Sequence, residues 1–530
     1  MADASSATLV RREAALGGRA SGDEAEGTTS AAPTEDRLIK AASLLAWVES
    51  EGATVSSVSA ASSSGAGVGL YAARDLQIGE EAFRCPCKLA LTADAAAADP
   101  LIGGPLRELR VDKEHSILLM LLHCARLGRT SYWSAYVDAL PTEDELVPLL
   151  PAFWPHSELE LLLGGTPLLA QARAAHAALC EFHESVVIGQ LSKRFPEVFP
   201  PDYFSFKRLC WAHAVYQSRA IRLPLPGGAR PSLVPLLDLM NHSTGLPSTV
   251  SYAYANGSGS GDDARTAATA SFVVVCGRST LAGEELMLNY GAKSNGELLR
   301  CHGFVSAENP ADVCELDLSM LRPDGISTPA TTRLAMLSDA LLAAGKRSIH
   351  DAPLSRHFLT VGPLLGASLL GASRVICAEE GSELRRAIAN VTGAEAEDEK
   401  EDGNDHFDWS LVDWSAEDPF AVANAAVQGR PPCGVPCERR MLSALERLIH
   451  ERTAALPASP ADAEERGGDE RGQQRRAAAH VYVDGLRTIL AGAAREVTRL
   501  LEATKVDGEA LEEAPAAAQS KRARHSRGIV

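Results

Sequence analysis

Polar side chains directly follow an apolar run in the segment from Leu236 to Ser243. The apolar residues end at Met240, and Asn241, His242 and Ser243 come next. Asparagine and aspartate favour turns because their side chains bond to nearby backbone groups, so a strand-ending turn explains this segment taken alone. The same residue types also bond to polar ligands, which makes Asn241 and His242 candidate binding residues as well as candidate structural ones.

A tyrosine occupies a similar place in the second candidate segment, Glu284 to Gly291. Tyr290 ends a short apolar stretch, and the residues from Asn295 to Phe304 then predict a short helix followed by a turn. A tyrosine at a strand end usually lies at the edge of the core with its hydroxyl in water. Its phenol can nevertheless orient a reacting group if the fold brings a ligand to it.

Closely spaced glycines form the third candidate, between Gly65 and Leu70. Glycines allow the backbone to approach a ligand because no Cβ is in the way, although such runs are more often turns. The setting is wrong for a dinucleotide fingerprint, which needs a strand before the glycines and a long helix after them.

The apolar pattern around these segments predicts a β region that is interrupted by helices. Residues with helical spacing begin near Glu35, and short strand-like pieces follow around residues 65–81. The pattern is helical from about Asp112 to Leu223. Strand-like sequence returns at residues 272–275 and 285–290. A helical block is therefore expected inside a mostly β domain.

The rest of the chain is expected to be helical from about residue 322 onward. Acidic or polar loops are predicted at residues 395–405 and 457–474. Disordered tails are expected at residues 1–34 and 506–530, because these ends lack a periodic apolar pattern.

In combination and in this order, the three segments resemble the SET-domain methyltransferases. Residues Asp238 to Ser243 match the element D-x-x-N-H-S of that family, and Tyr290 to Phe304 match its element Y-G-x-x-S-N-x-E-x-x-x-x-x-G-F. The similarity extends over roughly residues 35–501. It is strongest to the branch that contains the Rubisco large-subunit lysine methyltransferase and the actin-histidine methyltransferase.

The resemblance implies an α+β fold with two domains. Residues 35–321 would form a SET-domain β-fold with an inserted helical subdomain at about residues 112–223. Residues 322–505 would form an all-helical C-terminal substrate-binding domain of the Rubisco-methyltransferase type.

The resemblance also implies a site for S-adenosylmethionine. Tyr290 matches the catalytic tyrosine of the family. The residues that match its cofactor-binding positions are Gly67, Gly69, Leu70, Arg219, Asp238, Asn241, His242 and Phe304. Arg219 would approach the cofactor carboxylate, which suits a fixed cation.

The implied reaction is methyl transfer to a side-chain nitrogen of another protein. Catalysis of such an in-line displacement depends largely on alignment. A lysine acceptor, with a pKa near ~10.4 in water, must first lose its proton, which burial and a nearby cation favour. The Tyr290 hydroxyl, with backbone carbonyls, would orient the amine.

One residue departs from the family pattern, and another bears on whether the acceptor is lysine or histidine. Val68 stands between Gly67 and Gly69 where many relatives have arginine, so one cofactor contact could be weaker. Ile221 is apolar and suits the aliphatic part of lysine better than an imidazole. We expect a lysine methyltransferase acting on a non-histone protein. A histidine methyltransferase and a non-catalytic protein-binding module are the alternatives.

Composition excludes several other classes. The chain has 530 residues, a formal charge of -18 and 11 cysteines. An acidic surface disfavours direct nucleic-acid binding, and a basic protein partner suits it better. No cysteine pair has zinc-finger spacing, so no metal is expected. No apolar run reaches membrane-spanning length. We expect a monomer in the cytoplasm, with the chloroplast or the nucleus as alternatives.

Overall fold

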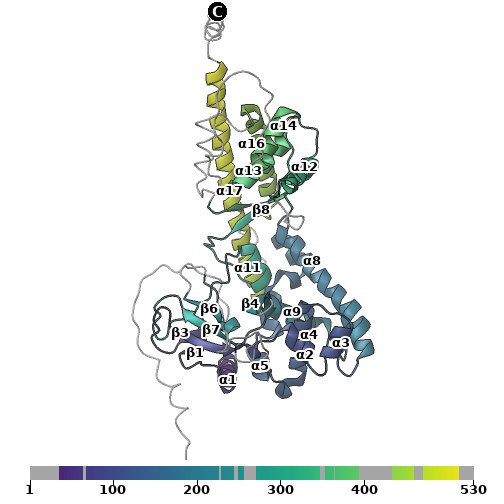
Figure 1. Ribbon diagram of the computed structural model, residues 1–530, viewed down its shortest axis with the longest axis vertical. Coiled ribbons are helices and arrows are strands. Elements are labelled where there is room, and N and C mark those ends of the chain that lie inside the picture. The colour runs from purple at the N-terminus through teal and green to yellow at the C-terminus, as the bar shows by residue number, and fades with distance from the viewer. Residues whose placement is uncertain are drawn as a thin grey trace, which may run out of the picture.

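The computed structural model describes residues 35–63, 67–225, 228–243, 249–255, 270–346, 353–362, 365–392, 433–458 and 469–512. These residues form two lobes stacked along the long axis of the molecule (Figure 1), and each lobe has its own hydrophobic core. The predicted tail at residues 1–34, the predicted loop at 395–405, and the first two residues of the glycine run lie outside the described residues. Of the tail predicted at 506–530, residues 506–512 continue helix α17 (Glu470–Glu512), and residues 513–530 lie outside the described residues.

The lower lobe contains several small antiparallel sheets. Its strands are β1 (Val58–Ser63), β2 (Gly67–Ala72), β3 (Glu81–Pro86), β4 (Ile221–Leu225), β5 (Gly228–Ser232), β6 (Val250–Ala255) and β7 (Ser271–Cys276). β1 pairs with β2, β4 pairs with β5, and β7 lies between β3 and β6. The strand predicted at residues 272–275 is confirmed as β7, whose Phe272 and Val274 are fully buried.

The strand predicted at residues 285–290 is not a regular strand. This segment is extended, but it pairs through isolated bridges, with Tyr71 on one side and with His242 on the other. Its apolar residues Leu286 and Leu288 are buried as a strand pattern requires. Because the segment changes partners along its length, no continuous ladder forms.

Helices make up most of the insert between β3 and β4. They are α2 (Ala93–Ala98), α3 (Gly103–Glu108), α4 (Lys113–Leu127), α5 (Ser134–Ala139), α6 (Glu143–Leu146), α7 (His156–Leu163), α8 (Pro167–Phe182), a π-helix (His183–Ser192) and α9 (Phe206–Arg219). The helical structure thus already begins at Ala93, ahead of the expected Asp112.

Helix α4 is the centre of the lower lobe. The Asp112 side chain caps its N-terminus by accepting a bond from the His115 amide, which satisfies one of the free amides of the first turn. Residues 116–124 are buried without interruption, so the helix is enclosed on all sides. Helix α1 (Glu35–Ser50) contributes the buried residues Ala41, Leu44 and Val48 to the same core.

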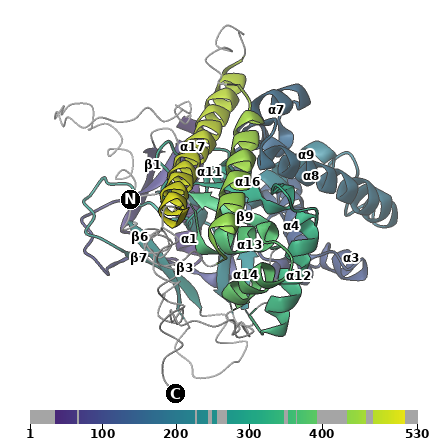
Figure 2. The ribbon, with the colours of Figure 1, turned by 90° about the horizontal axis from the view of Figure 1, so that it is seen from above.

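The upper lobe is mainly helical. Its elements are α11 (Asn295–His302), β8 (Val313–Asp317), α12 (Ala330–Ala343), β9 (Arg356–Thr360), α13 (Ala367–Cys377), α14 (Ser382–Thr392), α16 (Val435–Ala454) and α17 (Glu470–Glu512). Helices α16 and α17 lie side by side (Figure 2). Strand β9, which pairs with β8, was not expected in this helical region, and α17 starts within the predicted loop at 457–474.

The two cores share one helix. Leu168 and Ala172 in the first half of α8 belong to the core of the upper lobe, whereas Leu179 and Phe182 at its other end belong to the core of the lower lobe. The turn before α8 also touches the residue that follows α16 (Val435–Ala454), because a Cβ at Gly165 would overlap the Ala455 carbonyl. The helical insert is thus packed into both lobes.

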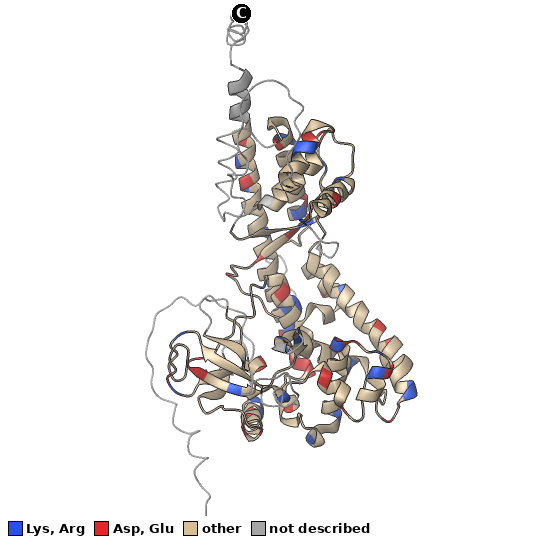
Figure 3. Cartoon of the chain, viewed as in Figure 1, with Lys and Arg blue, Asp and Glu red and all other residues tan. Residues whose placement is uncertain are grey.

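Charged side chains of both signs are interspersed over both lobes (Figure 3). Among the described helices, none combines the length and the apolar character that crossing a membrane requires. Within the same described ranges, no group of three or more His, Cys, Asp or Glu side chains is arranged to hold a metal ion.

Candidate active site

The extended segment 284–290 brings the three candidate segments together. On one side the Leu286 amide donates to the Leu70 carbonyl at 2.7 Å. On the other side the Leu288 amide donates to the Asn241 carbonyl at 2.9 Å. The glycine-containing strand β2 and residues 241–243 therefore flank one segment that leads directly into Tyr290.

Glu285 connects these segments through its side chain. One carboxylate oxygen accepts a 2.7 Å bond from Asn241 Nδ2, and the other accepts bonds from Ser63 Oγ at 2.9 Å and Tyr71 Oη at 3.3 Å. A Cβ at Gly69 would overlap the Glu285 carboxylate and lie 2.8 Å from Asn241 Nδ2. Glycine is required here because the backbone of β2 approaches the pair so closely.

Tyr290 is held at both its backbone and its hydroxyl. Its amide donates to His242 Nδ1 at 3.2 Å, and its hydroxyl donates to the Met240 carbonyl at 2.8 Å. Burial raises the pKa of Tyr290 to about 12, so the phenol keeps its proton at neutral pH. With that proton committed to Met240, the oxygen lone pairs remain as hydrogen-bond acceptors.

Tyr290 belongs to a cluster of four rings that we call the aromatic tetrad: His242, Tyr290, His302 and Phe304. Ring centroids are 4.8 Å apart for His242 and Tyr290, and 4.9 Å apart for Tyr290 and His302. Phe304 lies 5.9 Å from His302 and 6.0 Å from His242. Burial lowers the pKa of both histidines, to about 4 for His302, so both rings are neutral at physiological pH.

Arg219 and Asp238 lie close enough to Tyr290 to influence its pKa. Arg219 Nη1 donates to the Asp238 carbonyl at 2.7 Å, and the buried Tyr136 hydroxyl donates to the Asp238 carboxyl group. Burial raises the pKa of Asp238 to about 6, against the opposing effects of Arg219 and Tyr136. The Asp238 side chain is thus enclosed in the core, where it fixes the backbone that carries Asn241.

The chain is similar to proteins of known structure. No family model matches the chain. The structure is similar to the "SET domain of LSMT bound to Lysine and AdoHcy", with a TM-score of 0.60, 19% identity and coverage of 87% of this chain and 91% of that one. It is also similar to "Rubisco LSMT bound to AdoMet", with a TM-score of 0.58, 18% identity and coverage of 88% and 93%.

The chain has a SET-domain fold. This confirms the α+β fold and the resemblance expected from the three segments. Curated relatives agree: actin-histidine N-methyltransferase of Rhinolophus ferrumequinum is 26% identical over 345 residues, and that of Homo sapiens is 25% identical. These alignments cover 64% of this chain, which spans about half (52%) of the length of those relatives.

Arg37 is the site residue of this SET fold that sequence reasoning missed. Its Nη1 lies 3.4 Å from where a Cβ of Gly67 would be, so the guanidinium packs against β2. Burial lowers the pKa of Arg37 while Glu145, 3.5 Å away, raises it; the Arg219 charge lowers it further. Arg37 and Arg219 are therefore close enough for their charges to repel each other. Only the fold reveals this, because Arg37 belongs to α1.

Val68 and Leu70 point into the core of the SET fold. Both are buried, and Leu70 is fully so. Val68 therefore offers no group to a ligand, and Arg37 supplies a positive charge next to the same strand. Any contact of Leu70 with a ligand would have to involve its backbone, whose carbonyl already accepts from Leu286.

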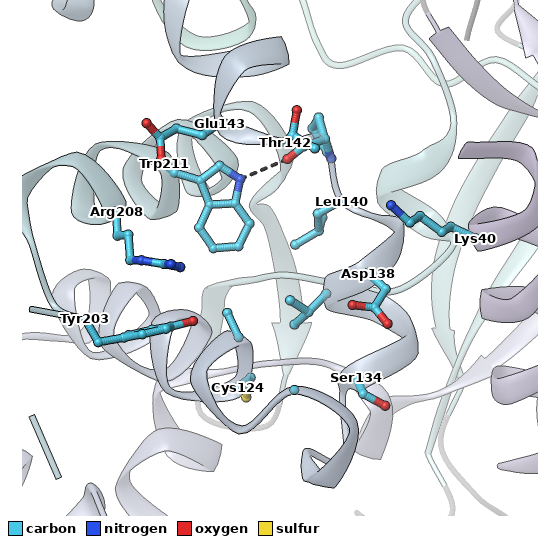
Figure 4. Close-up of a pocket in the computed structure, with 14 residues that line it drawn as sticks. Lys40, Cys124, Ser134, Asp138, Leu140, Thr142, Glu143, Tyr203, Arg208 and Trp211 are labelled. Carbon is cyan, nitrogen blue, oxygen red and sulfur yellow. Dashed lines mark hydrogen bonds between the residues drawn. The ribbon is translucent and has the colours of Figure 1, made fainter. Parts of the chain in front are cut away.

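A separate cavity of about 320 Å³ lies between α1, α5 and α9 (Figure 4). Trp211, Leu140 and Val137 form its apolar wall, and Arg208 lies over the ring of Tyr203 at its edge, 4.1 Å from the ring centroid. None of the nine candidate site residues lines this cavity. It is therefore distinct from the site around Tyr290.

Proposed function

We propose that this chain is an S-adenosylmethionine-dependent protein methyltransferase that acts on a lysine of a non-histone protein. The observation that carries the proposal is the convergence of Gly69, Asn241 and Tyr290 along segment 284–290. The similarity to SET-domain structures whose names include AdoMet or AdoHcy supports it.

The residues present fit the cofactor. The absence of a side chain at Gly69 lets Asn241 lie directly against strand β2. Arg37 and Arg219 suit its carboxylate, because guanidinium groups bind carboxylates well. The aromatic tetrad, with both imidazoles neutral, suits a positively charged sulfonium through the ring faces. Bound S-adenosylmethionine would supply an activated methyl group, and Asn241 and His242 would hold it in place.

The protein's own residues would align the acceptor nitrogen. This nitrogen must be neutral, since a protonated amine has no lone pair for the new carbon–nitrogen bond. With S-adenosylmethionine bound, the amine would take the methyl group, the electrons of the methyl–sulfur bond would stay on sulfur, and the amine would then release a proton to solvent. Tyr290 accepts a hydrogen bond from the amine, because its own proton is held by the Met240 carbonyl.

Lysine is our preferred acceptor because Ile221 offers no hydrogen bond to an imidazole. Histidine is the second candidate, since the curated relatives are named actin-histidine N-methyltransferases. We also propose that the chain acts as a monomer in the cytoplasm. A non-catalytic protein-binding module is the remaining alternative, to which the apolar Val68 would point.

Calorimetric titration with S-adenosylmethionine tests the proposal. We expect the wild-type chain to bind, Asn241→Ala to lose binding, and the exposed Asn390→Ala on α14 to bind as the wild type does. Tritiated S-adenosylmethionine incubated with actin, with Rubisco large subunit and with cell extract then identifies the acceptor, and hydrolysis separates methyl-lysine from methyl-histidine. A wild-type chain that binds no cofactor would refute the enzyme and favour the binding module.

A further inference from the structure

His302 is the member of the aromatic tetrad that no family element accounts for. It ends α11, one residue before Gly303, which adopts the left-handed conformation with a φ of 77°. This turn reverses the chain and places Phe304 beside the His302 ring, 5.9 Å between centroids. The Tyr290 ring also lies close to the His302 ring, with 4.9 Å between centroids and a tilt of 36°.

The proton of the His302 ring can be placed from its bonding. Nδ1 lies 3.0 Å from the Ser218 carbonyl in the last turn of α9. A carbonyl only accepts hydrogen bonds, so Nδ1 must carry the proton. The neutral ring therefore has its lone pair on Nε2. Burial, together with the charges of Lys293, His242 and Arg300, opposes a second proton there, while the Ser218 bond favours it.

That lone pair has no partner among the residues that the structure describes. Among the described residues, none donates a hydrogen bond to His302 Nε2, and this nitrogen is not one of those sealed from solvent. An accessible acceptor next to Tyr290 is suited to a ligand that brings an N–H group. The Ser218 bond fixes the ring, so the acceptor is preorganised rather than mobile.

We propose that His302 is a positioning residue whose Nε2 accepts a hydrogen bond from the N–H of the acceptor amine. This inference rests on the proposed function. A neutral primary amine has two N–H groups and one lone pair. Tyr290 Oη receives one N–H and His302 Nε2 receives the other, which leaves the nitrogen lone pair directed away from both and available for bonding to the methyl carbon.

Two substitutions of His302 distinguish the role of Nδ1 from the role of Nε2. In His302→Asn the amide nitrogen can replace Nδ1 and keep the bond to Ser218, but nothing remains at the place of Nε2. In His302→Gln the longer side chain brings an amide oxygen near that place. His183→Asn is the matched control, because its ring also bonds a backbone carbonyl, that of Phe204 at 3.0 Å, outside the site.

The probe is L-lysine titrated into the full chain saturated with AdoHcy, at about pH 9, where part of the amine is neutral. We expect His302→Asn to weaken lysine binding roughly tenfold while AdoHcy affinity stays unchanged. His302→Gln should recover most of the loss, and His183→Asn should behave as the wild type. Histidine-selective nitrogen-15 NMR of the wild type should find the His302 proton on Nδ1.

Equal lysine binding by His302→Asn and the wild type would overturn the inference. So would a wild type that binds AdoHcy but not lysine, or a His302 signal with its proton on Nε2. The NMR result decides the matter even if His302→Asn fails to fold. Absence of AdoHcy binding in the wild type would instead overturn the proposed function, and the inference with it.

Discussion

The carboxylate of Glu285 holds the amide of Asn241 by a hydrogen bond of 2.7 Å across 44 positions of the chain. The same carboxylate accepts bonds from Ser63 and Tyr71 of the β1–β2 hairpin. Glu285 thus sets the distance between the glycine strand and the residue proposed to bind the cofactor.

Replacing Glu285 is expected to weaken cofactor binding. Glu285→Ala leaves Asn241 without its partner, and the affinity for S-adenosylmethionine should fall roughly tenfold or more. Glu285→Gln should lose less, because one amide oxygen remains. Calorimetry measures both, with the neighbouring Glu284→Ala as control, since the Glu284 side chain bonds Leu281 N and Arg278 rather than Asn241. Equal losses for Glu284→Ala and Glu285→Ala would contradict this role.

Tyr290→Phe is expected to reduce turnover with little change in cofactor affinity. The substitution removes the hydroxyl that bonds Met240 and that is proposed to align the amine. Misalignment of a reacting nitrogen typically costs roughly 100-fold in rate. The rate of labelled methyl transfer provides the measurement, and Tyr252→Phe on β6 is the control. Full activity of Tyr290→Phe would show that the hydroxyl has no positioning role.

Arg37→Ala is expected to lower the affinity for S-adenosylmethionine by roughly tenfold at low salt, because it removes one of two cations from the site. The loss should shrink as ionic strength rises, since salt screens a partly exposed charge. Titrations at two salt concentrations test this, with the exposed Arg385→Ala of α14 as control. An affinity equal to that of the wild type would mean that Arg37 only pairs with Glu145.

Asp238 is expected to make stability depend on pH. Its pKa is raised to about 6 by burial, whereas an unfolded aspartate titrates near ~3.9. Below the pKa of the unfolded state, Asp238 is protonated in both the folded and the unfolded chain, so no buried charge reduces the stability. As pH rises through this window the folded state resists ionisation, so stability is lost by about 3 kcal/mol.

Thermal melts of the wild type and Asp238→Asn between about pH 4 and pH 7 measure this effect. The variant lacks the titrating group, so the stability of the wild type relative to Asp238→Asn should fall with rising pH. A difference in melting temperature that stays constant over this range would contradict the raised pKa.

The local parts of the fold could be read from the sequence, and the tertiary parts could not. The helical spacing of Ala41, Leu44 and Val48 marks the buried face of α1, and the apolar run at 272–275 marks β7. Segment 285–290 has the same apolar pattern as a strand, yet its bridging partners change along its length. Periodicity reports which side chains are buried, not with which backbone a segment pairs.

The candidate site likewise contains residues that the sequence marks and residues whose role only the folded structure reveals. Tyr290, Asn241 and His242 stand in recognisable segments, and the structure brings them together as expected. Arg37 and His302 have no such signal. Arg37 is one charged residue of an amphipathic helix, and His302 stands at a position that the matched element leaves unspecified. Their relevance comes from contacts with Gly67 and Ser218, which only the folded chain creates.

Helix α8 has a consequence for how the chain unfolds. Its two ends are buried in different cores, and the Arg475 guanidinium of α17 adds an ion pair to Glu158 of α7 at 2.6 Å. Separating the lobes would expose the apolar side chains of α7 and α8. The lobes should therefore melt in a single cooperative transition, and a recombinant fragment ending near Leu321 should aggregate. We therefore propose that the boundary expected at residue 321 does not separate two independently folding units.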